Sequence, residues 1–270
     1  MDMLRIAVFG ATGRMGINVT RAVASSDDAA VSGALVELGN DLIGADVAEV
    51  AGLAPIGVTV VDDPERAVRD ADVAIDFTLP DAAITNLDAC VKQGCSIVMG
   101  TTGLNDAQQQ ALRQAGQTIG VVYGRNMSVG VNVFTELARR AARLLGPEWE
   151  VEISEAHHRF KVDAPSGTAL QIGEAIAAER GQNLDDVACY RRQGSTGARP
   201  PEAIGFTSVR AGTLVGEHTV MLASDTELLR LEHRALDRAT FAQGALRAAR
   251  WLVQQPAGIY GMADVLELGD

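Results

Sequence analysis

The feature that most constrains the fold lies near the start of the chain, where a short apolar run leads into three evenly spaced glycines. Residues 4–9 (LRIAVF) have the content of a β-strand, Gly10, Gly13 and Gly16 follow, and apolar residues then recur at helical spacing. A strand, a glycine turn and a helix in this order are typical of a unit that binds a dinucleotide. The spacing is GxxGxxG instead of GxGxxG, and a glycine-rich connection without a ligand is the alternative.

Each glycine has a physical task in such a unit. Gly10 permits a tight turn, Gly13 lets the backbone approach a pyrophosphate, and Gly16 allows the helix to pack closely against the strand. The pyrophosphate would lie at the amino end of the helix, where backbone N–H groups and the helix dipole favour an anion. We therefore predict that the whole turn contacts a cofactor through Gly10, Ala11, Thr12, Gly13, Arg14 and Met15.

A second strand is expected over 31–36, and an acidic side chain follows it. A carboxylate at Glu37 would accept hydrogen bonds from the adenine ribose and repel a 2′-phosphate, which favours NADH. Arg14, directly after Gly13, could still bind a 2′-phosphate, so NADH and NADPH both stay open, with NADH preferred or equal. The alternative is that Glu37 is a solvated acid at a strand end.

The first ~125 residues alternate between strand and helix patterns, which indicates a parallel sheet with helices on both faces. Further strands are expected over 58–61, 73–78, 96–99 and 119–123. Ligands of such sheets bind at the carboxyl ends of the strands. Each residue there is individually typical of a turn, but together they are candidate cofactor contacts: Phe77, Thr78, Gly100, Thr101, Thr102, Gly124, Arg125, Asn126 and Met127.

After residue 128 the pattern changes to that of a second domain. A long helix, a strand with one polar face and further short strands indicate an α+β unit with a mixed, mostly antiparallel sheet. The expected ranges are a helix over 129–145, strands over 150–155, 204–209, 213–222 and 228–232, an exposed loop over 185–201 and a final helix over about 238–255. The predicted fold class is thus α/β, with a Rossmann-type doubly wound domain over 1–127 and 239–270 and a substrate-binding and oligomerisation domain over 128–238.

Groups that can move a proton near neutral pH are scarce in this chain and are concentrated in one segment. Of 23 basic residues only Lys92 and Lys161 are lysines, which leaves 21 arginines that cannot exchange a proton there. His157 and His158 are two of four histidines and lie just before Lys161. A histidine and a lysine four residues apart can supply a proton donor beside a cation. A structural histidine pair at a strand end is the alternative.

The residues after this cluster predict an anion site. Ser166, Gly167 and Thr168 precede apolar residues at helical spacing, and Ser166 has the position of an N-cap. The two hydroxyls and the backbone N–H groups of the helix start would bind a carboxylate close to His157, His158 and Lys161. An ordinary capped helix that binds nothing is the alternative.

Charge and cysteine content exclude several other classes of protein. A formal net charge of −12 argues against partners such as nucleic acid or an anionic membrane surface. Cys90, Cys95 and Cys189 lack a CxxC spacing, which fits reduced thiols in the cytoplasm and predicts no metal site. The first apolar run is too short to span a membrane and opens the glycine turn, so neither a signal peptide nor a transmembrane helix is expected.

Several motifs together resemble one enzyme family, the dihydrodipicolinate reductases, also called 4-hydroxy-tetrahydrodipicolinate reductases, of lysine and diaminopimelate synthesis. The resemblance covers nearly the whole chain, and the block that begins at Glu155 is its most specific part. The motifs are GATGRMG at Gly10, DFTLP at Asp76, GTTG at Gly100, NMSVGVNV at Asn126, EAHHRFKVDAPSGTA at Glu155, IGFTSVRAGTLVGEHTV at Ile204 and GMADVLEL at Gly261.

The resemblance implies that NADH or NADPH reduces 4-hydroxy-tetrahydrodipicolinate, a cyclic dicarboxylate, to tetrahydrodipicolinate. On this chain it implies that His157 donates a proton, that Lys161 assists and holds a carboxylate, and that His158, Gly167 and Thr168 bind the substrate. It also implies a homotetramer joined through the sheets of the substrate domain. Two other functions stay open, namely a related NAD-dependent imine or amino-acid dehydrogenase and a dinucleotide-sensing protein without turnover.

Three positions depart from the family pattern. The acidic residue that many members place at the end of the second strand aligns with Val36, and Glu37 takes the position of the Arg that often follows it. This puts the usual dual use of NADH and NADPH in doubt. Leu79 replaces a basic residue of some members and Phe160 replaces a His, but neither position carries a catalytic assignment.

Overall fold

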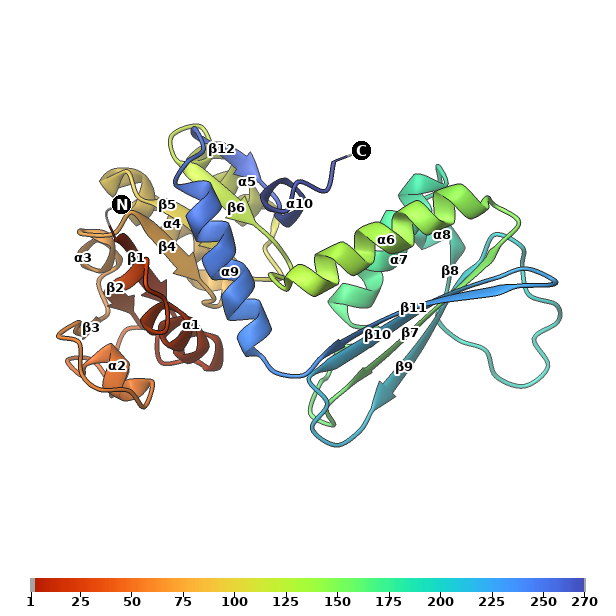
Figure 1. The fold of residues 1–270 in the computed structure, drawn as a ribbon, viewed down its shortest axis with the longest axis horizontal. Helices are drawn as coiled ribbons and strands as arrows, with labels where there is room; N and C mark the ends of the chain where they lie inside the picture. The colour runs from red at the N-terminus through yellow and green to blue at the C-terminus, as the bar shows by residue number, and fades with distance from the viewer. Residues whose placement is uncertain (1–2, 270) are drawn as a thin grey trace. The chain divides into compact units, whose positions relative to one another are not determined.

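The apolar run after the first residues forms β1 (Leu4–Phe9), an inner strand of a seven-stranded sheet in which every pairing is parallel. The computed structural model describes residues 3–269 (Figure 1). The strand order is β12-β6-β5-β4-β1-β2-β3. The chain thus adds β2 and β3 on one side of β1 and then β4, β5, β6 and β12 on the other. The strands are β1, β2 (Ala29–Leu35), β3 (Val60–Val61), β4 (Val73–Asp76), β5 (Ser96–Met99), β6 (Gly120–Tyr123) and β12 (Gly258–Tyr260).

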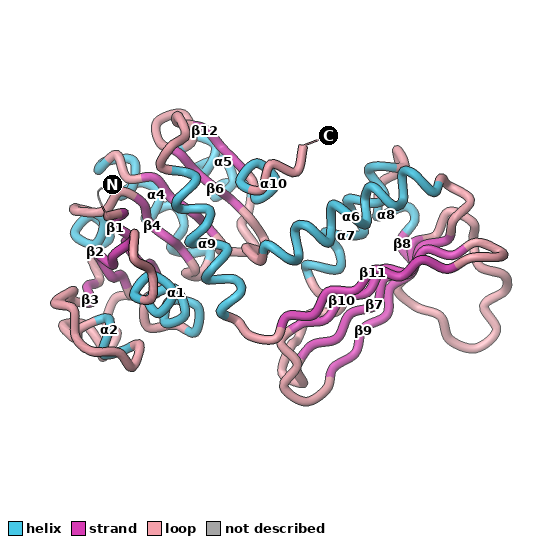
Figure 2. Tube along the Cα trace, in the orientation of Figure 1, coloured by secondary structure: helices cyan, strands magenta, loops and turns pink. Residues whose placement is uncertain are grey.

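Helices cover both faces of this sheet because successive residues of its strands point to opposite sides (Figure 2). In β1, Ile6 and Val8 pack in the same core as α1 and α9, whereas Ala7 and Phe9 pack in the core with α3, α4 and α5. This confirms the predicted doubly wound parallel sheet. The helices are α1 (Arg14–Ala24), α2 (Val47–Val50), α3 (Pro64–Val68), the 3-10 turn η1 (Pro80–Ala82), α4 (Ala83–Gln93), α5 (Asp106–Ala115), α9 (Ala239–Leu252) and α10 (Met262–Val265).

The chain divides into two compact units, one formed by the chain up to Val129 together with the chain from Arg238 onward, and the other by Gly130–Asp237. The second unit contains a five-stranded mixed sheet in the order β11-β10-β7-β9-β8. Its elements are α6 (Val129–Leu145), β7 (Glu150–His157), α7 (Gly167–Glu179), α8 (Leu184–Val187), β8 (Ala188–Cys189), β9 (Ile204–Arg210), β10 (Gly216–Ala223) and β11 (Leu228–Ala235).

One face of this mixed sheet is covered by α6 and α7, which pack on apolar residues of β7, β9 and β10 (Figures 1 and 2). In β7, Val151, Ile153, Glu155 and His157 are buried on this face and alternate with more exposed residues. Glu155 and His157 therefore continue the row of buried residues that begins with Val151 and Ile153.

Three details of the secondary structure differ from the sequence-based expectations. The segment 185–201 is not entirely loop, because α8 and β8 occupy its beginning, although most of the remainder is exposed. The strand expected from residue 213 begins at Gly216, after a turn. β9 pairs with β7 in parallel, so only the ladders of β10 with β7 and β11 are antiparallel.

The packing of α9 predicts an unusual effect of replacing one glycine. Alanine normally stabilises a helix interior relative to glycine by about 1 kcal/mol. A Cβ at Gly244 would lie 1.8 Å from the carbonyl oxygen of Met127, so Gly244→Ala should instead lower the free energy of unfolding by about 1–3 kcal/mol. Gln243→Ala, at an exposed position of the same helix, is the control in urea unfolding. An unchanged or higher stability of Gly244→Ala would contradict this account.

Candidate active site

The glycine turn of the first unit leaves an open backbone cradle at the start of α1. Gly10 has a positive φ of 74°. A Cβ at Gly16 would lie 2.1 Å from the Gly10 carbonyl oxygen, so the helix can approach the turn only with glycine there. Gly13 is the N-cap of α1 and provides no side-chain cap, which leaves the first N–H groups of the helix available to an anion. The turn therefore fits the pyrophosphate of a dinucleotide.

A cleft of about 830 Å³ lies beside this cradle in the same unit. It brings together a subset of the predicted cofactor residues, which come from the turn, the end of β2 and the end of β4, together with Val36 and Leu79. Predicted residues that line it are Gly10, Thr12, Gly13, Glu37, Phe77 and Thr78.

Other predicted residues have different positions in the first unit. Ala11 and Met127 are buried in the core, and Met15 packs against it. Arg14, Thr102 and Arg125 are exposed, and the side chain of Asn126 accepts a hydrogen bond from the Ser128 N–H at 2.9 Å. Gly100 lies under the ring of Phe77, and Gly124 lies beside Met127.

A buried carboxylate that the sequence analysis did not single out holds the loops at the end of the sheet. The Oδ1 atom of Asp76 accepts hydrogen bonds from the Thr78 N–H and hydroxyl, both at 2.7 Å, and from the Thr101 hydroxyl at 3.3 Å. Its Oδ2 atom accepts from the Asn86 amide at 2.9 Å. The hydroxyls of Thr78 and Thr101 thus fix the loop geometry, and only Thr78 also lines the cleft.

In the second unit, His157 is held in a network with Glu155 and Arg210. The His157 Nδ1 and Glu155 Oε2 atoms are 2.6 Å apart. Arg210 donates from Nη1 to Oε2 and from Nη2 to Oε1 of the same carboxylate, each at 2.8 Å. Burial alone raises the pKa of Glu155, but the hydrogen bonds from His157 and Arg210 hold that pKa well below its ordinary value. Glu155 is therefore ionised at neutral pH.

The predicted helix start lies against this network. The Ser166 hydroxyl accepts from the Ala169 N–H at 3.2 Å, which confirms Ser166 as the N-cap of α7. The Ser166 N–H donates to Glu155 Oε1 at 3.3 Å, and its hydroxyl lies 3.1 Å from His218 Nε2. A Cβ at Gly167 would meet no atom within 4 Å, so the helix start has open space beside it.

The remaining predicted residues lie close by in sequence. Lys161 pairs with Asp163, whose Oδ2 is 2.9 Å from its Nζ. The Lys161 N–H donates to the His158 carbonyl at 3.1 Å. Thr168 and His158 are half-buried, at the first turn of α7 and after the end of β7 respectively. The structure thus places all the predicted substrate residues in one unit and along one short segment.

Sequence reasoning missed three members of this network, namely Glu155, Arg210 and His218. A usable signal was present for Glu155, because residues two apart on a strand share a face, and this face includes His157. His218 is the register partner of Glu155 on β10, and Arg210 is that of His157 on β9. These pairings join residues that are 63 (218 − 155) and 53 (210 − 157) positions apart, beyond the range of local patterns.

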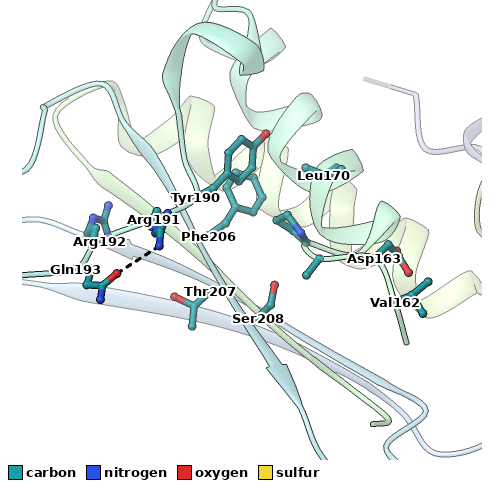
Figure 3. Close-up of a pocket in the computed structure, with 12 residues that line it drawn as sticks. Val162, Asp163, Leu170, Tyr190, Arg191, Arg192, Gln193, Phe206, Thr207 and Ser208 are labelled. Carbon is teal, nitrogen blue, oxygen red and sulfur yellow. Dashed lines mark hydrogen bonds between the residues drawn. The ribbon is translucent and has the colours of Figure 1, made fainter. Parts of the chain in front are cut away.

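A second hollow in the same unit runs beside the segment 162–165 (Figure 3). Its volume is about 1250 Å³, and the rings of Tyr190 and Phe206 lie along one side with centroids 5.2 Å apart. Arg192 at its rim is bound to Glu152 at 2.7 Å.

The part of the chain that the structure describes, residues 3–269, holds no cluster of three or more His, Cys, Asp or Glu suited to a metal ion. Within the same range, none of the helices has both the length and the apolar composition needed to cross a bilayer.

A doubly wound parallel sheet with a glycine cradle, followed by a mixed-sheet unit, is the architecture of two-unit proteins of the Rossmann type, which bind dinucleotides. Models described as "Dihydrodipicolinate reductase, N-terminus" and "Dihydrodipicolinate reductase, C-terminus" match residues 4–127 and 130–266. The chain therefore belongs to the dihydrodipicolinate reductase family.

Individual relatives agree with this assignment. The chain is 51% identical over 267 residues to the 4-hydroxy-tetrahydrodipicolinate reductase of Pseudomonas fluorescens strain SBW25, covering 98% of this chain and 100% of that protein. It is 48% identical over 266 residues to the enzyme of that name in Hahella chejuensis, with 98% and 100% covered. The structure of a dipicolinate-bound dihydrodipicolinate reductase from Paenisporosarcina sp. TG-14 aligns with a TM-score of 0.76 at 25% identity, covering 97% of this chain and 99% of that one.

Because His218 is buried, we predict that acid lowers the free energy of unfolding of the second unit. Burial, together with the neighbouring His157, lowers the pKa of His218 to about 3. The unfolded chain takes up a proton near pH 6.5, so the folded state loses stability as the pH falls below that value. Between about pH 7 and pH 5 this group should cost about 2 kcal/mol, and His218→Gln should remove that part of the loss.

Urea unfolding at pH 5, 7 and 8 checks this expectation. At pH 8 His218 is neutral in both states, so the difference between wild type and variant there gives the pH-independent effect of the substitution. If the free energy of unfolding depended on pH equally in wild type and His218→Gln, His218 would not be the group responsible for the loss of stability in acid.

Proposed function

We propose that this chain reduces 4-hydroxy-tetrahydrodipicolinate to tetrahydrodipicolinate with NADH or NADPH, in the synthesis of lysine and diaminopimelate. Full-length similarity to reductases of that name supports the substrate assignment. The observation that carries the chemistry is His157, which is bound to an ionised Glu155 within the segment that also carries Lys161 and the start of α7.

The 4-hydroxyl group leaves as water with a hydrogen of the adjacent ring carbon, which gives a conjugated ring, and this ring then takes up a hydride and a proton. The bound nicotinamide supplies the hydride. Hydride addition to one ring carbon builds negative charge on its conjugated neighbour, and a positioned acid must neutralise that charge. We assign this proton to His157. Lys161 holds a carboxylate and supports the developing negative charge.

The second carboxylate contact is assigned to the start of α7. Gly167 and Thr168, directly after the N-cap Ser166, present backbone N–H groups and the Thr168 hydroxyl at the positive end of a 13-residue helix. His158 is assigned to the same substrate. The dipicolinate bound in the Paenisporosarcina relative is itself a ring with two carboxylates, which supports a dicarboxylate ligand here.

We further propose that the first unit binds the dinucleotide and that the second binds the substrate and joins four copies of the chain. The sheet face opposite α6 and α7 supports such an assembly, because it carries Val209, which is 47% exposed, and the apolar residues Met221 and Ala223 of β10. A cytoplasmic location is supported by the free thiols of all three cysteines.

The central test is oxidation of NADH that depends on the cyclic dicarboxylate. We expect His157→Gln to lower kcat by ~10²–10⁴-fold with little change in KM, because a positioned acid contributes about that much. Lys161→Ala should lower kcat and raise KM for the dicarboxylate together. Lys92→Ala is the matched control, since Lys92 is the other lysine and pairs with Glu65 on the surface of the first unit. Near-wild-type turnover in a folded His157→Gln protein would contradict the assignment of His157 as the proton donor.

We propose that the cofactor preference depends on Glu37. Its Oε1 accepts from the Asn40 amide at 2.7 Å, and the same amide lies 3.4 Å from the Thr12 hydroxyl of the glycine turn. The bond from Asn40 lowers the pKa of Glu37, so its carboxylate is ionised at neutral pH. A 2′-phosphate at this end of the cleft would meet that charge.

NADH should therefore bind at least as tightly as NADPH, and Glu37→Arg should shift the preference toward NADPH. A difference of one to two kcal/mol corresponds to about five- to thirty-fold in affinity, which calorimetric titration of each cofactor measures. Glu49→Arg makes the same charge change at an exposed position of α2 outside the cleft and is the control. If wild type binds NADPH tenfold tighter and Glu37→Arg changes nothing, Glu37 does not face the ribose.

A further inference from the structure

We propose that Glu155 and Arg210 are a positioning pair that fixes His157 as the tautomer with the proton on Nδ1, so that Nε2 is the atom that exchanges a proton with the substrate. The catalytic part of this inference rests on the proposed function, whereas the tautomer itself does not. The proposal adds two residues and one defined ring atom to the site.

The register of three strands creates the contact. Glu155 and His157 lie two residues apart on β7 and so point to the same buried face. Arg210 on β9 is the register partner of His157, and its two Nη atoms bind both oxygens of Glu155 at 2.8 Å. A bidentate guanidinium holds a carboxylate in a fixed plane. That plane places Oε2 at 2.6 Å from His157 Nδ1.

The direction of this hydrogen bond follows from the chemistry of its two groups. An ionised carboxylate only accepts hydrogen bonds, so Nδ1 must carry the proton. Glu155 accepts from Arg210 and from the Ser166 N–H, and hydrogen bonds that include those from Arg210 hold its pKa well below the ordinary value despite burial, so Glu155 is ionised. After His157 donates a proton from Nε2, the neutral ring that remains already has the tautomer that Glu155 stabilises.

The surroundings of the ring support Nε2 as the exchanging atom. The side chain of His157 keeps 11% exposure, and a Cβ at Gly216 would come within 3.0 Å of Nε2, so glycine there leaves this atom room. The ring of His218 from β10 stands edge-on to His157 with centroids 5.3 Å apart, and its lowered pKa of about 3 keeps it neutral. Lys161 is paired with Asp163.

Glu155 and Arg210 also connect His157 through hydrogen bonds to residues 161–168, the segment to which substrate contacts are assigned. Glu155 Oε1 accepts from the N–H of Ser166, the N-cap of α7. Arg210 Nη2 donates to the carbonyl of Asp163 at 2.6 Å, next to the loop that carries Lys161. Loss of the charge at Glu155 should therefore disturb the orientation of His157 and its position relative to the start of α7.

The tautomer is tested in the wild-type protein by nuclear magnetic resonance after labelling with ¹⁵N-histidine. Only four histidines give signals, and the spectrum of His157→Gln assigns the one that matters. We expect neutral His157 to carry its proton on Nδ1, and Glu155→Gln to abolish that fixed preference. A wild-type His157 with its proton on Nε2 would overturn the proposal, whether or not the Glu155 variants fold.

Kinetics test the positioning role. Glu155→Gln should lower kcat by roughly 10–100-fold, as the loss of an orienting hydrogen bond does elsewhere, with KM for NADH unchanged. Glu155→Asp, which keeps the charge, should recover part of the loss. Glu217→Gln is the control, because Glu217 is an arginine-paired carboxylate on the neighbouring strand β10. If Glu155→Gln had the same kcat as Glu217→Gln, the positioning role of Glu155 would be overturned. If the wild type showed no dicarboxylate-dependent turnover, only the proposed function would be contradicted.

Discussion

A carboxylate that is buried and charged must have several hydrogen-bond donors around it, and in the second unit this requirement organises the site. The side chain of Glu155 is 1% exposed, and its donors come from three places, namely the end of β7, the end of β9 and the start of α7. Removing any donor would leave a buried charge poorly compensated, which is costly. The three segments are therefore held together by one carboxylate.

In the first unit, Asp76 has a comparable set of hydrogen-bond donors. Asp76 is fully buried at the end of β4, and its donors Thr78, Thr101 and Asn86 come from the loop after β4, the loop after β5 and helix α4. In both units a buried acid fixes loops at a strand end, and in the parallel sheet of the first unit this is the edge where ligands of such folds bind. In the first unit the two sets of side chains overlap, because Thr78 and Asn86 bind Asp76 and also line the cleft.

The parts of the structure that depend on local patterns were predictable from the sequence. The apolar run of β1, the glycine turn and the cap at Ser166 are each determined by neighbours within a few residues. The edge strand β12, with only the three residues Gly258–Tyr260, and the four-residue helices α2 and α10 are too short to show a period. The pairing of Arg210 with Glu155 depends on a parallel register of β7 with β9, which no local pattern encodes.

The distribution of histidine gives the two units different sensitivities to mild acid. All four histidines, His157, His158, His218 and His233, belong to the second unit, and burial lowers the pKa of His218 and His233. The first unit has no side chain that ordinarily titrates between pH 5 and pH 8. Mild acidification should thus loosen the mixed sheet while the parallel sheet stays folded, so the chain would pass through a half-folded state in which the glycine turn keeps its structure after the network around His157 has lost it.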